Sequence, residues 1–380
     1  MMLIEIFRCE NKIRFEYKSG DFKFNHTLIY PFYINPSDEA ITLIALFSRP
    51  KNFKECTIKN GELTYLSHKF MEKSINCRIN VKVKSWGNGV ATAYRPESGF
   101  LAFSGGFDSI ATNYVLGKDV PLASVNFGGV FEREFTWFKN FETTIFEWNI
   151  RDINETGIKF NEALDWRWLL SPMLLLKSMD NPFSIYTGTI MEASSYWWLD
   201  KKPIFNSYGY NVIGNGVALI CPVASITEYA TSVISSKFLS REQNISCLNS
   251  VAAEGSIKKY RKKVLLAIAS GEEMVEGCQE RYRFGTGLAD DMIALWLSWR
   301  LGVKWVLDNY CENFPANLNC DMSFFEKINT NNLDVLDDVT RKNTLKKFFD
   351  VGLKLYSADD FQYLKNATDA RSKFLENMAS

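Results

Sequence analysis

The residues with the clearest chemistry stand together in Ser104-Gly-Gly-Phe-Asp-Ser109. Two adjacent glycines let the backbone approach a ligand closely, and the two serines add hydroxyl donors. Residues 110–116 follow with the apolar spacing of one helical face, so the N–H groups at the helix start would point into the turn. These features predict an anion site, and phosphate is the anion that suits them best.

Asp108 narrows this prediction, because a carboxylate repels phosphate. A bridging Mg²⁺ removes the conflict, since a hard cation binds carboxylate and phosphate oxygens together. We therefore expect Asp108 to bind Mg²⁺ through the phosphates of a nucleotide. No Gly-Lys-Ser/Thr follows the glycines, so the loop is not a Walker loop. The alternative is an ordinary glycine-rich turn between a strand and a helix.

The pattern Ser-Gly-Gly-x-Asp-Ser resembles the pyrophosphate loop of the ATP pyrophosphatases, which cleave ATP between its alpha and beta phosphates. The resemblance implies ATP and Mg²⁺ as cofactors, and it makes Ser104 and Asp108 the catalytic residues. It implies the fold of the adenine nucleotide alpha hydrolases (the HUP fold) for this part of the chain. The residues expected to bind the nucleotide are Ser104, Gly105, Gly106, Phe107, Asp108, Ser109, Val125, Asn126, Phe127 and Gly188.

Within that superfamily the chain looks most like the cyano-deazaguanine synthases of queuosine biosynthesis. Those enzymes adenylate 7-carboxy-7-deazaguanine and use ammonia to form a nitrile. Phe127-Gly-Gly-Val-Phe-Glu-Arg-Glu134 is similar to the pattern that ends their second strand, and Ser246-Cys247 to the start of their zinc site. Glu254, Ile257 and Tyr260 stand where the other three thiolates would be. A lone thiolate cannot hold structural zinc, so we expect no zinc site.

The function expected from this resemblance is ATP-dependent adenylation of a carboxylate or amide. Divergent relatives with N-terminal extensions are found in bacterial antiphage operons, where a deazaguanine-type enzyme modifies a partner protein. A role in defence, with a partner protein as acceptor, is therefore included in the expectation. Two alternatives stay open: a tRNA-modifying enzyme with the same loop, and a non-catalytic subunit that only binds ATP. Asp108 argues against the second, because a pure binder does not need a metal carboxylate.

Bulk composition indicates which partners and which cellular compartment to expect. The chain has 380 residues, 46% apolar and 23% charged, as in ordinary globular proteins. Its 44 basic and 44 acidic residues cancel, which weighs against a nucleic-acid partner. Eight cysteines without a Cys-x-x-Cys pair are expected to be buried thiols. The sequence contains no signal peptide and no membrane-spanning apolar run, so we expect a cytoplasmic protein, and we expect a homodimer.

The elements around the loop alternate between strand and helix, which predicts a parallel, Rossmann-like α/β sheet. Apolar runs predict strands at residues 100–103, 121–129, 145–150, 184–188 and 217–222. Helices are expected at residues 132–144 and 161–179. In such sheets the ligand lies beyond the carboxyl ends of the strands, so residues 104–109, 127–129 and 188–192 should converge there.

We expect three domains: a β-rich N-terminal domain (residues 1–95), a pyrophosphatase domain (96–255) and a helical C-terminal region (256–380). Alternation of apolar and charged residues predicts half-buried strands at residues 13–17 and 77–83. Helical segments are expected at residues 227–237, 256–270, 288–299, 304–313, 338–356 and 359–377.

Several further residues have two interpretations. Glu192 could bind a metal or a substrate amine, but capping of a nearby helix is the stronger expectation. Lys237, Lys262 and Lys263 could reach phosphates, yet the charge run at residues 258–263 is typical of a solvated helix face. The glycine-bearing loop 281–287 is expected to be a surface turn rather than a substrate contact. Trp197-Trp198 could stack a planar substrate, although burial in a core is the stronger expectation.

Overall fold

The computed structural model describes residues 1–84, 98–152, 164, 166–176, 183–193, 198, 217–274, 277, 280–318 and 320–379. They form a mixed α/β fold with a large, mostly parallel sheet. The chain divides into two compact units. Unit 1 comprises the described residues of Met1–Ser104, Val120–Tyr186 and Phe205–Ile220, and unit 2 those of Gly105–Asp119, Thr187–Ile204 and Cys221–Ser380. Among the described helices, none combines the length and the apolar character that a membrane crossing requires.

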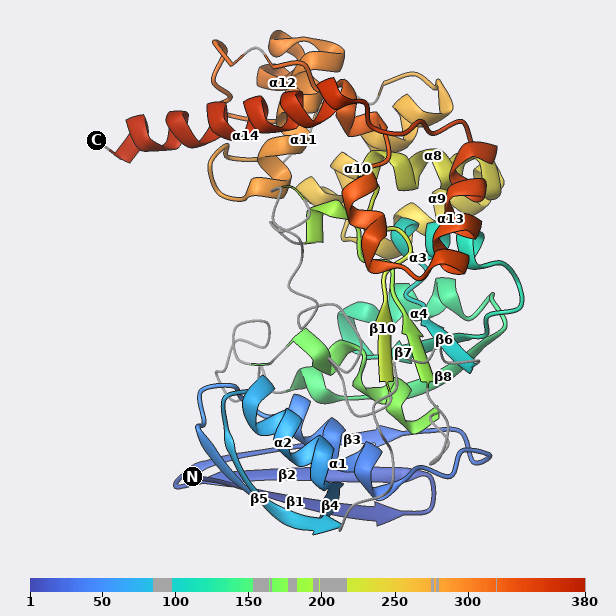
Figure 1. Ribbon diagram of the computed structural model, residues 1–380, viewed down its shortest axis with the longest axis vertical. Helices are drawn as coiled ribbons and strands as arrows, with labels where there is room; N and C mark the ends of the chain where they lie inside the picture. Colours follow the sequence, from blue (N-terminus) through green and yellow to red (C-terminus); the bar gives the residue numbers. More distant parts are fainter. Residues whose placement is uncertain are drawn as a thin grey trace. The chain divides into compact units, whose positions relative to one another are not determined.

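All ten strands of the described residues join one sheet in unit 1, in the order β10-β9-β6-β7-β8-β3-β2-β1-β4-β5 (Figure 1). The strands are β1 (Met2–Cys9), β2 (Lys12–Ser19), β3 (Phe22–Ile29), β4 (Glu55–Thr64), β5 (Arg78–Lys84), β6 (Ser98–Ala102), β7 (Leu122–Asn126), β8 (Thr143–Trp148), β9 (Phe183–Tyr186) and β10 (Val217–Ile220).

The half of the sheet from β10 to β8 is entirely parallel. Counted along the chain from β6, its order is 5-4-1-2-3, which is that of a doubly wound sheet. The order reverses between β6 and β9, the two strands after which Ser104 and Gly188 follow. All five strands predicted for this region are confirmed, because each is a short apolar run that the sheet buries.

The N-terminal strands extend the same sheet. Strands β1, β2 and β3 pair antiparallel, and β3 joins the parallel half through Leu28 opposite Trp148 and Ile29 opposite Glu147. The predicted strands at residues 13–17 and 77–83 are confirmed as β2 and β5. Figure 1 shows helices α1 (Asp38–Phe47) and α2 (Tyr65–Ser74) packed over these strands, and neither helix was expected from the sequence.

A buried hydrogen-bond network fixes the junction between β3 and β8. Trp148 Nε1 donates to His26 Nδ1 at 2.8 Å, and His26 Nε2 lies 3.2 Å from the Tyr17 hydroxyl. That hydroxyl lies 2.7 Å from Ser48 Oγ, at the end of α1. Burial lowers the pKa of His26 to about 3, so the imidazole is neutral and donates from Nε2. The network is therefore structural.

Two predicted helices of unit 1 differ from the structure. The helix expected at residues 132–144 is confirmed over its first half, as α4 (Glu132–Phe138), but it ends earlier than predicted, and β8 begins at Thr143. Asn140 helps to end it, because its side chain donates to the carbonyls of Thr136 and Trp137. Of the helix expected at residues 161–179, the described part forms two 3₁₀ turns, Trp166–Leu169 and Ser171–Leu176.

Unit 2 is helical. Its helices in the described residues are α3 (Phe107–Leu116), α8 (Glu228–Phe238), α9 (Arg241–Val251), α10 (Ile257–Ser270), α11 (Leu288–Leu301), α12 (Val303–Asn309), α13 (Asp338–Asp350) and α14 (Ala358–Ala379). The six helices predicted beyond residue 225 are confirmed, although α12 and α13 end before the predicted residues 313 and 356. Helix α9 was missed. The compact units do not follow the boundaries expected near residues 95 and 255, which stay predictions of where folding domains end.

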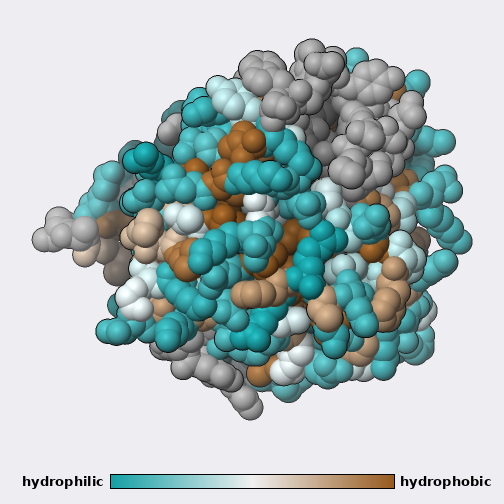
Figure 2. Space-filling view, turned by 90° about the horizontal axis from the view of Figure 1, so that it is seen from below, coloured by the Kyte–Doolittle hydropathy of each residue, from teal (hydrophilic) through white to brown (hydrophobic). Residues whose placement is uncertain are grey.

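The surface offers no single dominant apolar area on the face drawn in Figure 2, where hydrophilic side chains surround scattered apolar patches. Strongly exposed apolar side chains of the described residues include Phe32, Tyr33 and Val130, each more than 70% exposed. Singly exposed apolar residues are normal on folded proteins. The polar clusters are therefore the better candidates for a functional site.

Candidate functional site

The predicted phosphate loop leads directly into α3. Gly105 has φ +76°, a left-handed conformation that favours glycine, and Gly106 is the N-cap of the helix. Gly106 has no side chain to cap the helix, and Phe107, fully buried, anchors the first turn in the core. The Ser109 hydroxyl donates to the Gly106 carbonyl at 2.9 Å, within this turn. The loop thus has the backbone form expected of an anion site at a helix start.

Gly188 approaches this helix start very closely. A Cβ atom at Gly188 would lie 2.8 Å from both the carbonyl carbon of Asp108 and the nitrogen of Ser109. Only glycine allows this contact without a backbone shift. Since Gly188 follows β9 and Asp108 follows β6, the segments after these two strands meet at α3, as the strand order predicts.

A second support comes from α9. The Cys247 thiol donates to the Gly105 carbonyl at 3.2 Å, and Cys247 is fully buried. Burial raises the pKa of this thiol to about 12, so it keeps its proton and remains a donor. The cysteine that resembles the start of a zinc site therefore buttresses the loop in this fold.

Asp108 lies in the first turn of α3 with 31% of its side chain exposed. Its Oδ1 accepts a hydrogen bond from Thr231 Oγ1 at 2.9 Å and lies 3.5 Å from the Lys262 ammonium. No donor of the described residues reaches Oδ2. One carboxylate oxygen is thus fixed by α8 and α10, and the other is available to a cation.

The Lys262 ammonium is buried beside the loop, since only 3% of its side chain is exposed. It contacts Glu228 Oε1 at 2.6 Å and lies 5.5 Å from the centre of the Phe107 ring. Burial disfavours the charged form, but Asp108 and Glu228 outweigh it and raise the pKa of Lys262 to about 12. Lys262 is therefore charged near neutral pH, and the expectation of a solvated face is wrong at this residue.

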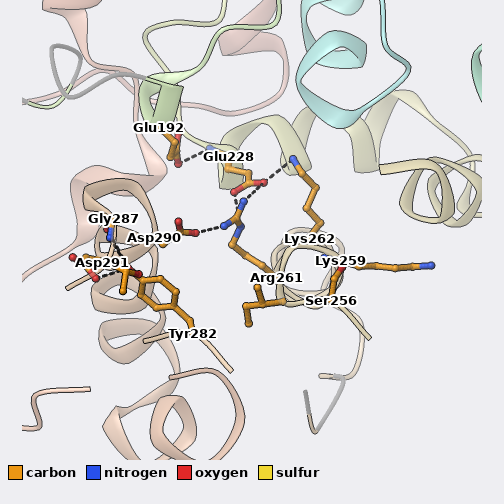
Figure 3. Close-up of polar contacts among 12 residues, drawn as sticks. Glu192, Glu228, Ser256, Lys259, Arg261, Lys262, Tyr282, Gly287, Asp290 and Asp291 are labelled. Atoms are coloured by element: carbon orange, nitrogen blue, oxygen red, sulfur yellow. Dashed lines mark hydrogen bonds and ion pairs between the residues drawn. The ribbon is translucent and has the colours of Figure 1, made fainter. Parts of the chain in front are cut away.

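Glu228 is the centre of a buried ion-pair cluster (Figure 3). Its Oε2 lies 2.9 Å from Arg261 Nε, its Oε1 contacts Lys262, and Arg261 pairs on its other side with Asp290. Burial alone would raise the pKa of Glu228, but the two cations lower it to about 2. We call this sequence of contacts, Asp108–Lys262–Glu228–Arg261–Asp290, the charge chain.

Glu192 caps α8, the helix whose first residue is Glu228. Its Oε1 accepts the backbone N–H of Glu228 at 2.8 Å, which confirms the expected capping role. The other oxygen, Oε2, is buried and has no hydrogen-bond partner in the described part of the chain. Burial, followed by the charge of Glu228, raises the pKa of Glu192 to about 8. Glu192 is therefore mostly protonated at pH 7.

The other predicted site residues lie in unit 1. Ser104 is exposed and directly precedes Gly105 in the chain. Val125 and Asn126 end strand β7, and Asn126 Oδ1 accepts the backbone N–H of Gly128 at 2.9 Å. The Phe127 ring lies beside Trp168, at 5.3 Å between ring centres. The roles of these residues in binding adenine or phosphate stay predictions.

Contacts and burial decide the interpretations of Lys263, Lys237 and Trp198. Lys263 is partly exposed and pairs with Glu254 at 2.8 Å, and Lys237 donates to the Val351 carbonyl at 2.6 Å. Trp198 is buried and stacks on Phe325, whereas Trp197 lies outside the described residues. Neither lysine contacts the loop.

The glycine-bearing loop 281–287 is more deeply anchored than a surface turn. The fully buried Asp291 accepts from the Tyr282 hydroxyl and from the Gly285 backbone, each at 2.7 Å. Phe284 is buried and paired with Asn313 through its backbone. The loop is therefore partly buried and hydrogen-bonded within unit 2, and its expected exposure is wrong in part.

The sequence did not predict a site role for three residues: Glu228, Thr231 and Arg261. Thr231 reaches Asp108 across 123 positions of the chain, and Arg261 reaches Glu228 across 33. A signal existed for Lys262, because it lies three and four residues before Leu265 and Leu266 and so shares their buried helix face. No comparable pattern marks Glu228.

The donor groups of this site fit a nucleotide that is bound together with Mg²⁺. A helix start with glycines, an available carboxylate oxygen and a buried ammonium together match phosphate and a hard cation. Among the described residues, no group of three or more His, Cys, Asp or Glu is placed to hold a metal. A Mg²⁺ here would be held by Asp108 together with phosphate oxygens.

No protein-family model, curated protein or solved structure matches this chain. The resemblance of the loop to the ATP pyrophosphatases therefore stays a prediction from its residues.

Proposed function

We propose that this protein is a Mg²⁺-dependent enzyme that cleaves ATP between its alpha and beta phosphates to adenylate a carboxylate or amide. The observation that carries the proposal is the position of Asp108. It stands in the first turn of a helix that follows two glycines, with one oxygen fixed and the other available. The available oxygen, beside two glycines at a helix start, supports a metal-bound nucleotide over a turn that only joins a strand to a helix.

In this reaction a substrate oxygen attacks the alpha phosphorus, and the bond between that phosphorus and the bridging oxygen breaks. Pyrophosphate leaves with the electron pair, and the substrate is left as its adenylate. Bound Mg²⁺ would neutralise the phosphates when the nucleotide is present. The step depends on positioning and charge neutralisation more than on proton transfer. Gly105, Gly106 and the first turn of α3 supply the positioning, and Asp108 orients the cation.

The substrate class is an acid or amide that ammonia or another amine then attacks. The likeness to cyano-deazaguanine synthases makes 7-carboxy-7-deazaguanine the first acid to test, and a carboxylate on a partner protein the second. The expected adenylate, the homodimer and a role in antiphage defence are parts of the same proposal. A subunit that binds ATP without cleaving it is the alternative that the experiment must separate.

The test measures AMP and pyrophosphate formation from ATP with candidate acids, for the wild type and for Asp108→Asn. Asparagine keeps the shape and the hydrogen bond from Thr231 but loses the charge that Mg²⁺ requires. We expect AMP formation to fall by at least ~100-fold, while the exposed variant Glu132→Gln keeps wild-type rates. Unchanged AMP release in Asp108→Asn contradicts the proposal. ATP binding without AMP formation, with every acid and partner tried, favours the non-catalytic subunit.

A further inference from the structure

The Lys262 ammonium is placed unusually for a residue in a charge run. Burying an unpaired ammonium is very costly, so its position requires the two carboxylates that flank it. The contact with Glu228, at 2.6 Å, is close, whereas the one with Asp108, at 3.5 Å, is long. Glu228 therefore holds Lys262, and Asp108 is the partner that can be exchanged.

Exchange is expected when a cation binds Asp108. A Mg²⁺ held by this carboxylate would offset its negative charge and so weaken the attraction between Asp108 and Lys262. The ammonium then faces the loop with Glu228 as its one remaining close carboxylate among the described residues. An anion arriving at the loop would find a buried, fully charged partner already in place.

We propose that Lys262 neutralises the pyrophosphate that leaves during adenylation, and that Glu228 is the positioning residue that holds Lys262 at the loop. This inference depends on the proposed function. When the bond between the alpha phosphorus and the bridging oxygen breaks, the electron pair stays on that oxygen. Lys262 takes up this growing charge, and no proton needs to move.

Glu228 is suited to positioning because it is held on several sides. Glu192 accepts its backbone N–H at 2.8 Å, and Arg261 pairs with its second carboxylate oxygen. Arg261 is itself held by Asp290 in the first turn of α11. Figure 3 shows Glu228 between the two cations, with Asp290 beyond Arg261. Arg261 is thus committed to carboxylates, whereas the Lys262 ammonium also lies 3.5 Å from Asp108.

The experiment compares Lys262→Met and Glu228→Gln with the control variant Lys263→Met, which removes the neighbouring charge. The readouts are kcat and KM for ATP, and the affinity for inorganic pyrophosphate with Mg²⁺ by calorimetry. We expect Lys262→Met to lower kcat by at least ~100-fold, to change KM little, and to weaken pyrophosphate binding by at least ~10-fold. The control should keep wild-type values.

A double-mutant cycle tests the positioning role. If Glu228 acts through Lys262, Glu228→Gln lowers kcat, and the double variant Lys262→Met/Glu228→Gln is no slower than Lys262→Met alone. The double variant also removes both charges of the close pair, so it serves as the folded test protein if Lys262→Met does not fold. Wild-type kcat and wild-type pyrophosphate affinity in either Lys262 variant overturn the inference.

The outcome separates this inference from the proposed function. If the wild type forms AMP, Asp108→Asn is inactive and the Lys262 variants are fully active, then the proposed role of Lys262 is wrong and the proposed function is unaffected. If the wild type forms no AMP but binds pyrophosphate with Mg²⁺ through Lys262, then the proposed function is wrong and the anion site is supported.

Discussion

The protonated Glu192 carboxyl makes a direct prediction about stability and pH. Its pKa in the folded protein is about 8, against an ordinary value of 4.5. Between these values the folded state binds one more proton at this group than the unfolded state does. Raising the pH therefore favours unfolding, and the stabilising contribution of the proton, complete below pH 4.5, is lost as the pH rises through 8. The slope approaches about 1.4 kcal/mol per pH unit.

The perturbation is Glu192→Gln. Glutamine keeps an oxygen that can accept the Glu228 N–H, but it carries no charge at any pH. The free energy of unfolding is measured by urea denaturation at intervals from pH 5.5 to 7.5. Over these two units we expect the wild type to lose about 2 to 3 kcal/mol more than the variant. The difference in the free energy of unfolding between the variant and the wild type should therefore shift in favour of the variant from pH 5.5 to pH 7.5.

The exposed variant Glu132→Gln is the matched control, and its pH dependence should follow that of the wild type. Parallel curves for wild type and Glu192→Gln would show that Glu192 is ionised in the folded protein. In that case a second carboxylate stands unprotonated beside Glu228. The reasoning from burial and from the unpartnered Oε2 would then be refuted.

Two further substitutions test the scaffold. Gly188→Ala places a Cβ 2.8 Å from the backbone of Asp108 and Ser109, so thermal unfolding should show a loss of about 1 to 3 kcal/mol. Gly287→Ala should cost far less, because among the described residues its Cβ meets only Asp290 Oδ2, at 3.5 Å. Equal losses would contradict the close contact at Gly188. Trp148→Phe removes the donor to His26 Nδ1 and should cost about 1 to 3 kcal/mol in urea denaturation. Trp299→Phe, 39% exposed, is its control, and equal stability of both variants would show that the network contributes little.

Local patterns were sufficient to predict the parallel half of the sheet. Each strand from β6 to β10 is a short apolar run, and burial between layers requires that composition. Longer-range effects caused the errors. The N-terminal helix α1 is almost entirely buried, so its apolar run was read as part of a strand region, although the cap Ser37 and the acidic Asp38 and Glu39 were visible signals. Helix α9 was missed because polar residues dominate it.

The candidate site divides in the same way. The loop and Asp108 were predictable because six consecutive residues carry the chemistry. Lys262 was assigned to a solvated face because a run of like charges usually is one, and only the neighbouring leucines opposed that interpretation. Glu228 could not be found, since its burial depends on Arg261, Lys262 and Glu192, which come from two other segments of the chain.

The charge chain should respond to a ligand at the end that lies beside the loop, and its interior pairs should stay unchanged. Signs alternate along it, and it holds one more carboxylate than cations. The end members, Asp108 and Asp290, have 31% and 35% of their side chains exposed, whereas Lys262 and Glu228 have 3% and 4%. Breaking an interior pair leaves a buried charge unpaired, which costs about 3 to 5 kcal/mol. Releasing Asp108 to a metal costs far less, because that contact is long and partly solvated. Ligand binding should therefore change the chain at the loop and leave the Glu228–Arg261 pair closed.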